Sequence, residues 1–307
     1  MSDIFNIKYI AYSQIDKSKW NNCIDTADNG LIYAYSFYLD AMSTHWDALV
    51  FNDYEAVMPL TWKKKYSIPY LYQPFLTAQS GVFGEEITPE MLNSFVEAIP
   101  LSFRFIDINL NSGNPSGIPA DYSTDRSNYI LRLNNSYEDL YKNYRENIQR
   151  NIKKAIYSGC TVEKDFSVEK VIELAVNQMK KQGQQAGENI DRFRKLYQHL
   201  HSKQMAVTYG ISLHTKLLAS CVLFFSHNRA YYILVGNHPD GKTTGASHAL
   251  IDAFVKDYAG KNILLDFEGS DIPSLALFYS SFGAEHETYP ALKINRLPFY
   301  LRWMKGG

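Results

Sequence analysis

The chain of 307 residues lacks a charge imbalance, a cysteine framework and any long apolar run. Its 31 Lys and Arg residues against 32 Asp and Glu residues give a formal net charge of −1, which argues against a general nucleic-acid binder. The three cysteines, Cys23, Cys160 and Cys221, are far apart and odd in number. They fit neither a disulfide framework nor a zinc pattern, and they indicate a reducing compartment.

The sequence also lacks a membrane span and an export signal. No apolar run reaches the ~18 residues that a spanning helix needs, and residues 1–20 alternate polar and apolar side chains without the apolar core of a signal peptide. We therefore expect a cytoplasmic protein. No His, Cys and Asp spacing predicts a metal site, and no Gly-x-Ser-x-Gly segment predicts a serine hydrolase. The sequence does not indicate an oligomeric state.

What the sequence does contain predicts an α+β fold. Residues 205–235 alternate as three strands joined by compact turns, which is typical of an antiparallel meander. Residues 140–155 carry apolar side chains every three or four positions, which predicts one amphipathic helix. The other face of this helix is basic and includes Arg145 and Arg150; it is either a solvated face or a binding surface for phosphate groups.

The first half of the chain has one aromatic-rich segment, residues 66–83, which includes Tyr72 and Gln73. Aromatic side chains mostly pack in cores, so this segment is either a packed loop and strand or one wall of a substrate cleft.

A glycine-bearing segment, GKTTGAS (Gly241–Ser247), lies between the strand at 230–235 and a predicted helix at 246–259. The first N–H groups of a helix lack partners, so such a turn can bind a pyrophosphate, with a lysine and hydroxyls adding contacts. An ordinary turn is the alternative. The segment is neither a Walker loop nor a dinucleotide fingerprint. The candidate cofactor-binding residues are Val235, Gly241, Lys242, Thr243, Thr244, Gly245, Ala246 and Ser247. His238, beside them, is a candidate substrate contact.

In its wider context this segment resembles motifs of the GNAT acyltransferase superfamily. There an Arg/Gln-x-x-Gly-x-Gly/Ala signature opens a helix and holds the pyrophosphate of acyl-coenzyme A. Here Lys242 stands for Arg/Gln and Ser247 for Gly/Ala. Tyr279 and Gly283 match a Tyr-x-x-x-Gly motif of the superfamily. The resemblance implies acyl-coenzyme A as donor and Tyr279 as the acid that protonates the departing thiolate.

More specifically, the chain resembles FemAB-type proteins, which join two GNAT-like domains. The resemblance is carried by the basic helix ending in Gly159, by Thr244–Leu250, and by Asp266–Ser270 followed by Phe278–Gly283. FemAB proteins commonly have lysine where this chain has Tyr279, a lysine implicated in binding the phosphate-bearing peptidoglycan precursor. The tyrosine therefore favours coenzyme A over aminoacyl-tRNA as the donor.

N-acyl transfer also needs a base for the amine proton. Residues 263–268 are predicted to form a strand, in which alternation places Asp266 and Glu268 on one face, and both are candidate bases. For Asp266 the alternative is a structural hydrogen-bond acceptor, and for Tyr279 it is aromatic packing beside Phe278 and Phe282.

These observations lead to one set of expectations. The fold is two tandem GNAT-like domains, each a mixed, mostly antiparallel sheet flanked by helices. Residues 1–135 form the acceptor side and residues 136–307 the cofactor side, with the last ~15 residues packing back on the first domain. The function is N-acyl transfer from acyl-coenzyme A to a small-molecule or peptide-like amine. The alternatives are FemAB-like aminoacyl transfer from tRNA to a cell-envelope precursor, and a GNAT pair that binds a ligand without catalysis.

Overall fold

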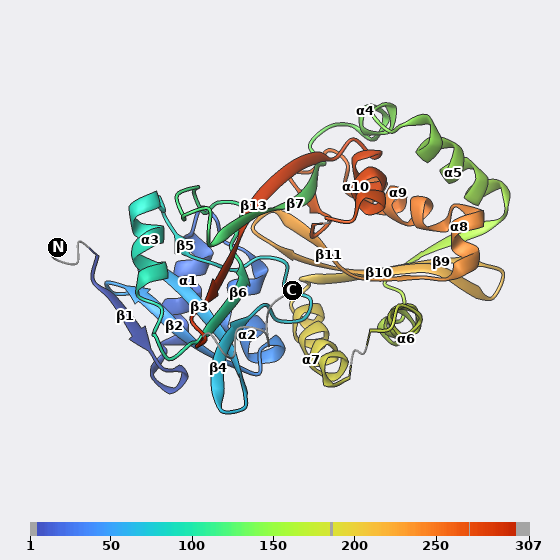
Figure 1. The fold of residues 1–307 in the computed structure, drawn as a ribbon. Helices are drawn as coiled ribbons and strands as arrows, with labels where there is room; N and C mark the ends of the chain where they lie inside the picture. Colours follow the sequence, from blue (N-terminus) through green and yellow to red (C-terminus); the bar gives the residue numbers. More distant parts are fainter. Residues whose placement is uncertain (1–4, 185–186, 270, 299–307) are drawn as a thin grey trace. The chain divides into compact units, whose positions relative to one another are not determined.

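A computed structural model describes residues 5–184, 187–269 and 271–298 (Figure 1). The chain divides into two compact units. Unit 1 comprises residues 1–126 and 288–307, and unit 2 comprises residues 127–287. The expectation that the last ~15 residues return to the first domain falls largely on residues 299–307, which lie outside the described residues.

The sheet of unit 1 is mostly antiparallel. In spatial order its strands are β1 (Ile7–Ile10), β2 (His45–Phe51), β3 (Ala56–Lys65), β4 (Ile68–Tyr72), β6 (Phe105–Asn109) and the later part of β13 (Glu285–Asn295), while β5 (Phe83–Gly84) pairs with β3. One pair is parallel: residues 70–72 of β4 lie beside residues 105–107 of β6. The core of unit 1 fills with Leu, Ile, Met and Phe side chains from these strands and from the adjacent helices.

Three α-helices and two short 3-10 helices pack in unit 1. They are η1 (Tyr12–Gln14), α1 (Lys17–Thr26), η2 (Ile32–Ala34), α2 (Ser36–Met42) and α3 (Pro89–Glu97). The side chain of Asp16 caps α1, and that of Thr88 caps α3 ahead of Pro89. Both caps supply acceptors for helix N–H groups that have no partner within the helix. Trp20 of α1 and Phe95 of α3 are fully buried, so these helices are fixed by their apolar faces.

The sheet of unit 2 contains the expected meander. Its strands in spatial order are β7 (Ser123–Arg132), β12 (Leu264–Asp266), β11 (Arg229–Asn237), β10 (Lys216–Ser226), β9 (Ala206–Leu213) and β8 (Cys160–Lys164). Strands β9, β10 and β11 are antiparallel neighbours, whereas β11 and β12 are parallel. A parallel pair requires a crossover connection, and helix α9 (Ala246–Tyr258) provides it.

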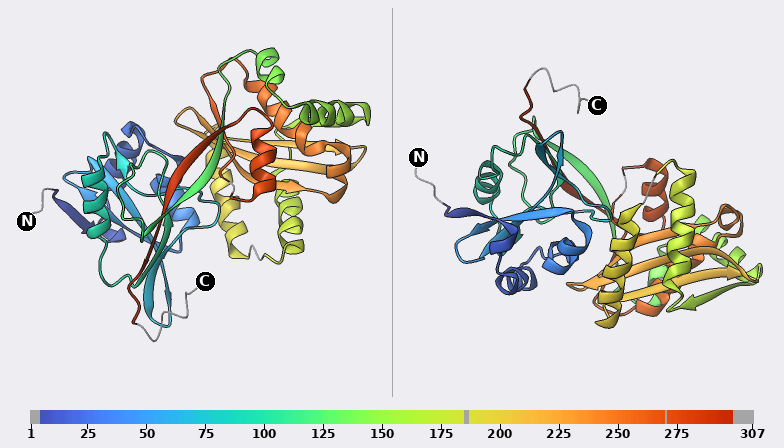
Figure 2. Two further views of the ribbon diagram at one scale, coloured as in Figure 1. Left: turned by 45° about the horizontal axis from the view of Figure 1, so that its top comes forward. Right: turned by 90° about the horizontal axis from the view of Figure 1, so that it is seen from below.

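Helices cover both faces of the unit 2 sheet. Helices α6 (Val168–Lys181) and α7 (Glu188–Ser202) lie on one face, and α9 lies on the other together with α4 (Tyr137–Lys142), α5 (Glu146–Tyr157), α8 (Pro239–Thr244) and α10 (Pro273–Ser280) (Figures 1 and 2). Both units thus have a mixed sheet flanked by helices, as the sequence predicts. Among the described residues, no helix combines the length and the apolarity needed to cross a bilayer.

The single helix predicted over residues 140–155 is wrong in one respect, because the structure divides it into α4 and α5. Arg145 has an extended backbone (φ −61°, ψ 150°), and its N–H donates to the carbonyl of Ser281 at 2.9 Å instead of continuing the helix. The apolar stripe nevertheless survives the break, since Leu140, Tyr144 and Ile148 are all buried. A periodic pattern identifies a buried face and cannot detect a tertiary hydrogen bond that interrupts the helix.

Candidate functional site

The candidate site of unit 2 is built around the parallel strands β11 and β12. Their pairing consists of three residues on each strand, Arg229–Tyr231 beside Leu264–Asp266. Strand β12 then ends, while β11 continues to Asn237 along its other neighbour, β10. Within residues 5–184, 187–269 and 271–298, the edge of β11 that faces β12 therefore has no strand partner beyond Tyr231. Val235, one of the predicted cofactor residues, lies on this continuation and is half-buried.

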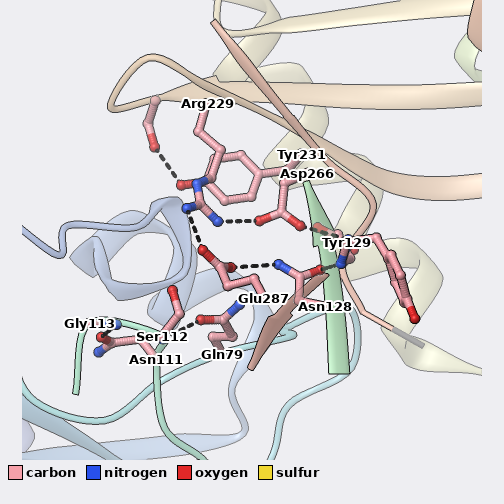
Figure 3. Close-up of polar contacts among 12 residues, drawn as sticks. Gln79, Asn111, Ser112, Gly113, Asn128, Tyr129, Arg229, Tyr231, Asp266 and Glu287 are labelled. Atoms are coloured by element: carbon pink, nitrogen blue, oxygen red, sulfur yellow. Dashed lines mark hydrogen bonds and ion pairs between the residues drawn. The ribbon is translucent and has the colours of Figure 1, made fainter. Parts of the chain in front are cut away.

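A buried ionic network holds the start of this strand pair (Figure 3). The Arg229 guanidinium lies 2.6 Å from Asp266 and 3.7 Å from Glu287. Asn128 donates to Glu287 at 2.9 Å. Burial by itself disfavours the charged guanidinium, but Asp266 and Glu287 outweigh it and raise the pKa of Arg229. The network therefore joins β7, β11, β12 and β13 through charges that compensate one another.

Asp266 is occupied by structural partners. Its Oδ2 atom accepts from Arg229, and its Oδ1 atom accepts the backbone N–H of Glu268 at 2.7 Å. The side chain is almost fully buried. These contacts fit the structural alternative for Asp266 better than the role of a base, which needs a lone pair facing the substrate.

Glu268 does not lie on the strand. Strand β12 ends at Asp266, and Glu268 has φ +63° and is followed by Gly269 at φ +86°. The alternation that placed Asp266 and Glu268 on one face is therefore wrong for Glu268, because a turn redirects its side chain. Left-handed backbone at a residue other than glycine is uncommon and often occurs at functional sites.

Tyr279 lies on α10, directly beside the end of β12. Its ring stacks on Phe267 with centroids 4.4 Å apart and an interplanar angle of 17°. Burial, with a smaller contribution from the charge of Glu268, raises the pKa of Tyr279 to about 12. The charge of Glu268 is thus close enough to Tyr279 to act on its hydroxyl. The aromatic packing does not exclude a chemical role, since one ring can both stack and donate its hydroxyl hydrogen.

The glycine-bearing segment has a different structure from the predicted turn. Residues 239–244 form the short helix α8, and Gly245 follows in left-handed conformation (φ +80°). A Cβ atom on Gly241 would lie 2.6 Å from the carbonyl oxygen of Leu218, and one on Gly245 would lie 2.2 Å from that of Asn151. Both glycines are therefore required for close backbone packing, against β10 and α5, and they are not by themselves evidence for a phosphate.

The polar side chains of this segment are largely engaged within it. Thr243 and Thr244 donate to the carbonyl of Asp240, and Ser247 donates to Asn237 at 2.6 Å. His238 caps α8 by accepting the N–H of Asp240 at 3.2 Å. Lys242 is exposed, and Ala246 is buried at the start of α9. Helix α9 begins at Gly245 without a side-chain cap, so its N-terminus remains the feature of this segment best suited to an anion.

The basic residues Arg145 and Arg150 belong to the start and middle of α5. Arg145 is the N-cap residue of the helix. Arg150 lines an open groove of about 710 Å³, together with Glu146, Gln149, Lys153, Lys154, Tyr157 and Ser158. The groove lies on the solvent-facing side of the helix, which matches the basic face that the sequence predicts.

Tyr72 and Gln73 lie in unit 1, and their part in a substrate site stays a prediction. The Tyr72 hydroxyl accepts the N–H of Thr44 at 3.0 Å, and the Lys63 ammonium lies 4.4 Å from the centroid of its ring. Gln73 accepts the N–H of Asn109 and donates to the carbonyl of Thr77. Within unit 1 both side chains therefore have structural partners.

No pattern in the sequence indicated Arg229, Asn128 and Glu287, which form the network in Figure 3 together with Asp266. Arg229 opens a strand after the turn His227–Asn228, where a solvated arginine is the ordinary expectation. Its partner Glu287 accepts from Asn128, and these two residues are 159 positions apart in the chain. No local pattern connects them, and covariation among homologous sequences would be the signal able to do so. In the described part of the chain, no group of three or more His, Cys, Asp or Glu side chains has metal-binding geometry.

Both units share one layered arrangement, a mixed sheet flanked by helices, which is the arrangement expected of GNAT-like domains. Comparison with known proteins agrees: residues 142–271 match the family model described as an acetyltransferase (GNAT) domain. No curated protein matches the sequence significantly.

The similar solved structures extend the match over both units. FemX has a TM-score of 0.65 at 12% identity, covering 97% of this chain and 100% of that chain. A conserved Bacteroides thetaiotaomicron protein of unknown function has a TM-score of 0.60 at 12% identity, covering 94% and 99%. A tandem GNAT protein from the clavulanic acid biosynthesis pathway has a TM-score of 0.53 at 9% identity, covering 95% and 99%. The fold is thus a FemAB-like tandem of GNAT domains, and the predicted fold class is confirmed.

Proposed function

We propose that this protein is an N-acyltransferase that moves an acyl group from acyl-coenzyme A to an amine. The observation that carries the proposal is the end of β12, where Glu268 and Tyr279 come together beside the unpaired edge of β11. In a GNAT fold this is the place for a thioester, because the freed strand edge offers backbone groups to an extended ligand. The donor is assigned to residues 136–307 and the amine to residues 1–135.

The proposed chemistry needs one base and one hydrogen-bond donor. Glu268 accepts a proton from the attacking amine, the nitrogen forms a bond to the carbonyl carbon, and the carbon–sulfur bond breaks to release the thiolate. The thiolate takes up one proton, so that an amide and a free thiol are formed. Tyr279, with a pKa of about 12, stays protonated at neutral pH. It is a weaker acid than a thiol, whose pKa is about 8.5, so its main contribution is a hydrogen bond to the developing thiolate.

Binding of the donor draws on fewer residues than the sequence suggested. Ser247 and the threonines of α8 bond within the protein, and the glycines are explained by packing. For the pyrophosphate there remain the N-terminus of α9, which has no side-chain cap, and the exposed Lys242. Together they supply a positive helix end and one cation.

The test is an assay for the release of free thiol from acetyl-coenzyme A in the presence of each of a panel of small amines. The variants are then compared with the wild type on the amine that gives the fastest release. We expect Tyr279→Phe to lower kcat by about 10²-fold, within the range for removal of one hydrogen bond to a developing negative charge. Glu268→Gln should act similarly. The exposed Tyr157→Phe is the matched control and should leave kcat unchanged. If the folded protein binds coenzyme A in calorimetry but releases no thiol with any amine, the proposed acyl transfer is wrong. The result would then support a GNAT pair that binds a ligand without catalysis.

A second candidate is aminoacyl transfer from charged tRNA to an amine, and the basic groove on α5 favours it. Arg150, Lys153 and Lys154 line that groove. Phosphate contacts release counterions, so RNA binding should weaken steeply with salt. The second candidate would be preferred if charged tRNA binds in a salt-dependent way, if Lys153→Glu abolishes this binding, and if coenzyme A does not bind.

A further inference from the structure

Unit 1 contains a small pocket whose lining residues have no assigned role in the proposed acyl transfer. Its volume is about 250 Å³. It lies where η1, the end of α2 and the beginning of β2 meet, and β3 contributes one side. The lining residues are Tyr12, Asp40, Ser43, Thr44, His45, Trp46, Asp47 and Trp62.

Asp47, one lining residue, is a buried carboxylate held by neutral donors. It accepts from the Tyr9 hydroxyl at 2.8 Å, from the N–H of Tyr12 at 2.9 Å and from the Trp62 indole at 2.7 Å. Within the described residues, no basic side chain forms an ion pair with it. A buried charge is ordinarily paired or hydrogen-bonded, and a carboxylate offers about four acceptor positions. Three of these positions are taken, so the Asp47 carboxylate has one acceptor position left.

The walls of the pocket are aromatic. His45 stacks on Trp62 with centroids 4.4 Å apart, and Tyr12 meets Trp46 edge-on at 5.6 Å. The Trp46 indole donates to Asp40 at 3.0 Å, which fixes its ring. Aromatic faces attract cations within about 6 Å of the ring centroid.

Cations of the protein itself already use the edges of this cluster. The Lys17 ammonium lies 4.6 Å from the Tyr12 centroid and 2.8 Å from Asp40, and the Lys64 ammonium lies 5.5 Å from the Trp62 centroid. Asp40 is thus neutralised by Lys17. Asp47 is not, so the charge available to a ligand is negative.

Ser43 supplies an independent observation. Its side chain is buried, and its hydroxyl has no hydrogen-bond partner in the described part of the protein. Leaving a buried hydroxyl unpaired costs about 1–3 kcal/mol, and such a group at a pocket is a place where a ligand donor or acceptor fits. An ammonium with N–H groups can donate to Ser43 and to Asp47, whereas a quaternary ammonium cannot.

We propose that this pocket binds a small primary or secondary alkylammonium. The charge pairs with Asp47, one N–H donates to Ser43, and the alkyl part lies among the aromatic rings. The volume suits a ligand of a few heavy atoms and excludes a nucleotide. The proposal concerns unit 1 alone and does not depend on the acyl-transfer proposal.

The test is a titration of the whole protein with propylammonium chloride at neutral pH and constant ionic strength, followed by calorimetry and tryptophan fluorescence. A ligand of so few heavy atoms is expected to bind with a millimolar dissociation constant. Propan-1-ol, which has the same length but no charge, should bind at least about tenfold more weakly. Tetramethylammonium should also bind more weakly than propylammonium.

Two variants and one control complete the test. Asp47→Asn should weaken binding at least about tenfold, and Ser43→Ala about fivefold, because it removes one hydrogen bond. Asp53→Asn removes one acid of unit 1 outside this pocket and should have no effect. Thermal melting checks that each variant is folded. If Asp47→Asn does not fold, the result for Ser43→Ala is the one that tests the proposal. Equal binding of propan-1-ol, no saturable binding up to about 0.1 M, or unchanged binding in Ser43→Ala would overturn the proposal.

Discussion

Each unit contains one parallel strand pair of three residues, and the two pairs end differently. In unit 1, β4 stops at Tyr72 beside Asp107 of β6, and the next side chain, Gln73, accepts the N–H of Asn109. The side chain thus continues the pairing where the strand ends. In unit 2, β12 stops at Asp266, and Phe267, Glu268 and Tyr279 lie beyond it. One end is closed by a structural amide, and the other presents a carboxylate and a phenol.

The helices that connect the two strands of each parallel pair also differ, because one begins with a side-chain cap and the other does not. Helix α3 of unit 1 begins with a side-chain cap, Thr88, which accepts the N–H of Met91 at 3.2 Å. Helix α9 of unit 2 begins at Gly245 without such a cap, and it buries an ionisable group, Asp252. At the end of the parallel pair and at the start of the crossover helix, side chains supply hydrogen bonds in unit 1, whereas in unit 2 the crossover helix has no side-chain cap. This difference supports placing the donor in unit 2.

The largest effect is expected from breaking the ionic network at the start of β11. Arg229→Met leaves Asp266 and Glu287 without their cation, and removing one partner of a buried pair costs about 3–5 kcal/mol. Urea unfolding of unit 2 measures this loss. Arg132→Met is the control, because its pair with Glu285 is exposed and contributes at most about 1 kcal/mol. Equal losses in the two variants would contradict a buried network.

The next effect concerns pH and the buried acid of α9. Burial raises the pKa of Asp252 from 3.8 to about 6. The hydrogen bond that the Tyr137 hydroxyl donates to Asp252 lowers this pKa, but by less than burial raises it. Because the folded pKa lies above the unfolded one, the folded state binds the extra proton between these values. Protonation of Asp252 therefore contributes about 3 kcal/mol to the free energy of unfolding below pH ~4. This contribution is lost as the pH rises through ~6.

Asp252→Asn removes that titration. The free energy of unfolding of the variant, subtracted from that of the wild type at each pH, should fall between pH ~4 and ~6. Glu138→Gln, an exposed acid on α4, is the control and should give a flat difference. A flat difference for Asp252→Asn as well would show that Asp252 titrates normally.

A smaller effect is expected at the start of α9. Gly245→Ala and Gly260→Ala both place a side chain at a left-handed position, at φ +80° and +77°, which costs about 1–2 kcal/mol each. Only at Gly245 does the new Cβ meet another backbone, that of Asn151 at 2.2 Å. We expect Gly245→Ala to lose about 1–3 kcal/mol more in denaturant unfolding. Similar losses of stability at both positions would contradict the packing explanation for Gly245. Phosphate binding would then again be the explanation for this glycine.

The smallest effect tests the closed end of the unit 1 pair. Gln73→Ala deprives the Asn109 N–H of its acceptor, with an expected loss of about 1 kcal/mol. Hydrogen exchange should become faster at Asn109. Asn93→Ala, which removes an exposed bond to Gly117, is the control. Unchanged exchange at Asn109 would mean that Gln73 does not close this end.

Much of the fold could be predicted because it depends on local patterns. The alternation over residues 205–235 and the turns between the strands led to the meander that β9, β10 and β11 form. The helix predicted at residues 246–259 corresponds to α9, Ala246–Tyr258. Strand β8 was missed, since most of its side chains are exposed and alternate poorly. The break at Arg145 was missed because its cause, the carbonyl of Ser281, is distant in the sequence.

For the site, the sequence indicated the segments but not the conformations. Tyr279 and Glu268 were both selected, and the structure places them near each other. Alternation failed at Glu268 because a strand of three residues is too short for the pattern to show where it ends. The glycines were selected for a phosphate, but glycine also permits close backbone packing, and the sequence alone cannot separate the two causes.

The sequence by itself determined the antiparallel meander, because alternation and turn residues act over a few positions, and its motifs resemble those of tandem GNAT-like proteins, which implied the fold. Only the tertiary structure decided that Asp266 pairs with Arg229, that Gly245 packs on α5, and that Asp47 is buried among neutral donors and aromatic rings. These facts depend on contacts between residues far apart in the chain. The energy of a buried charge is set by such neighbours, not by its place in the sequence.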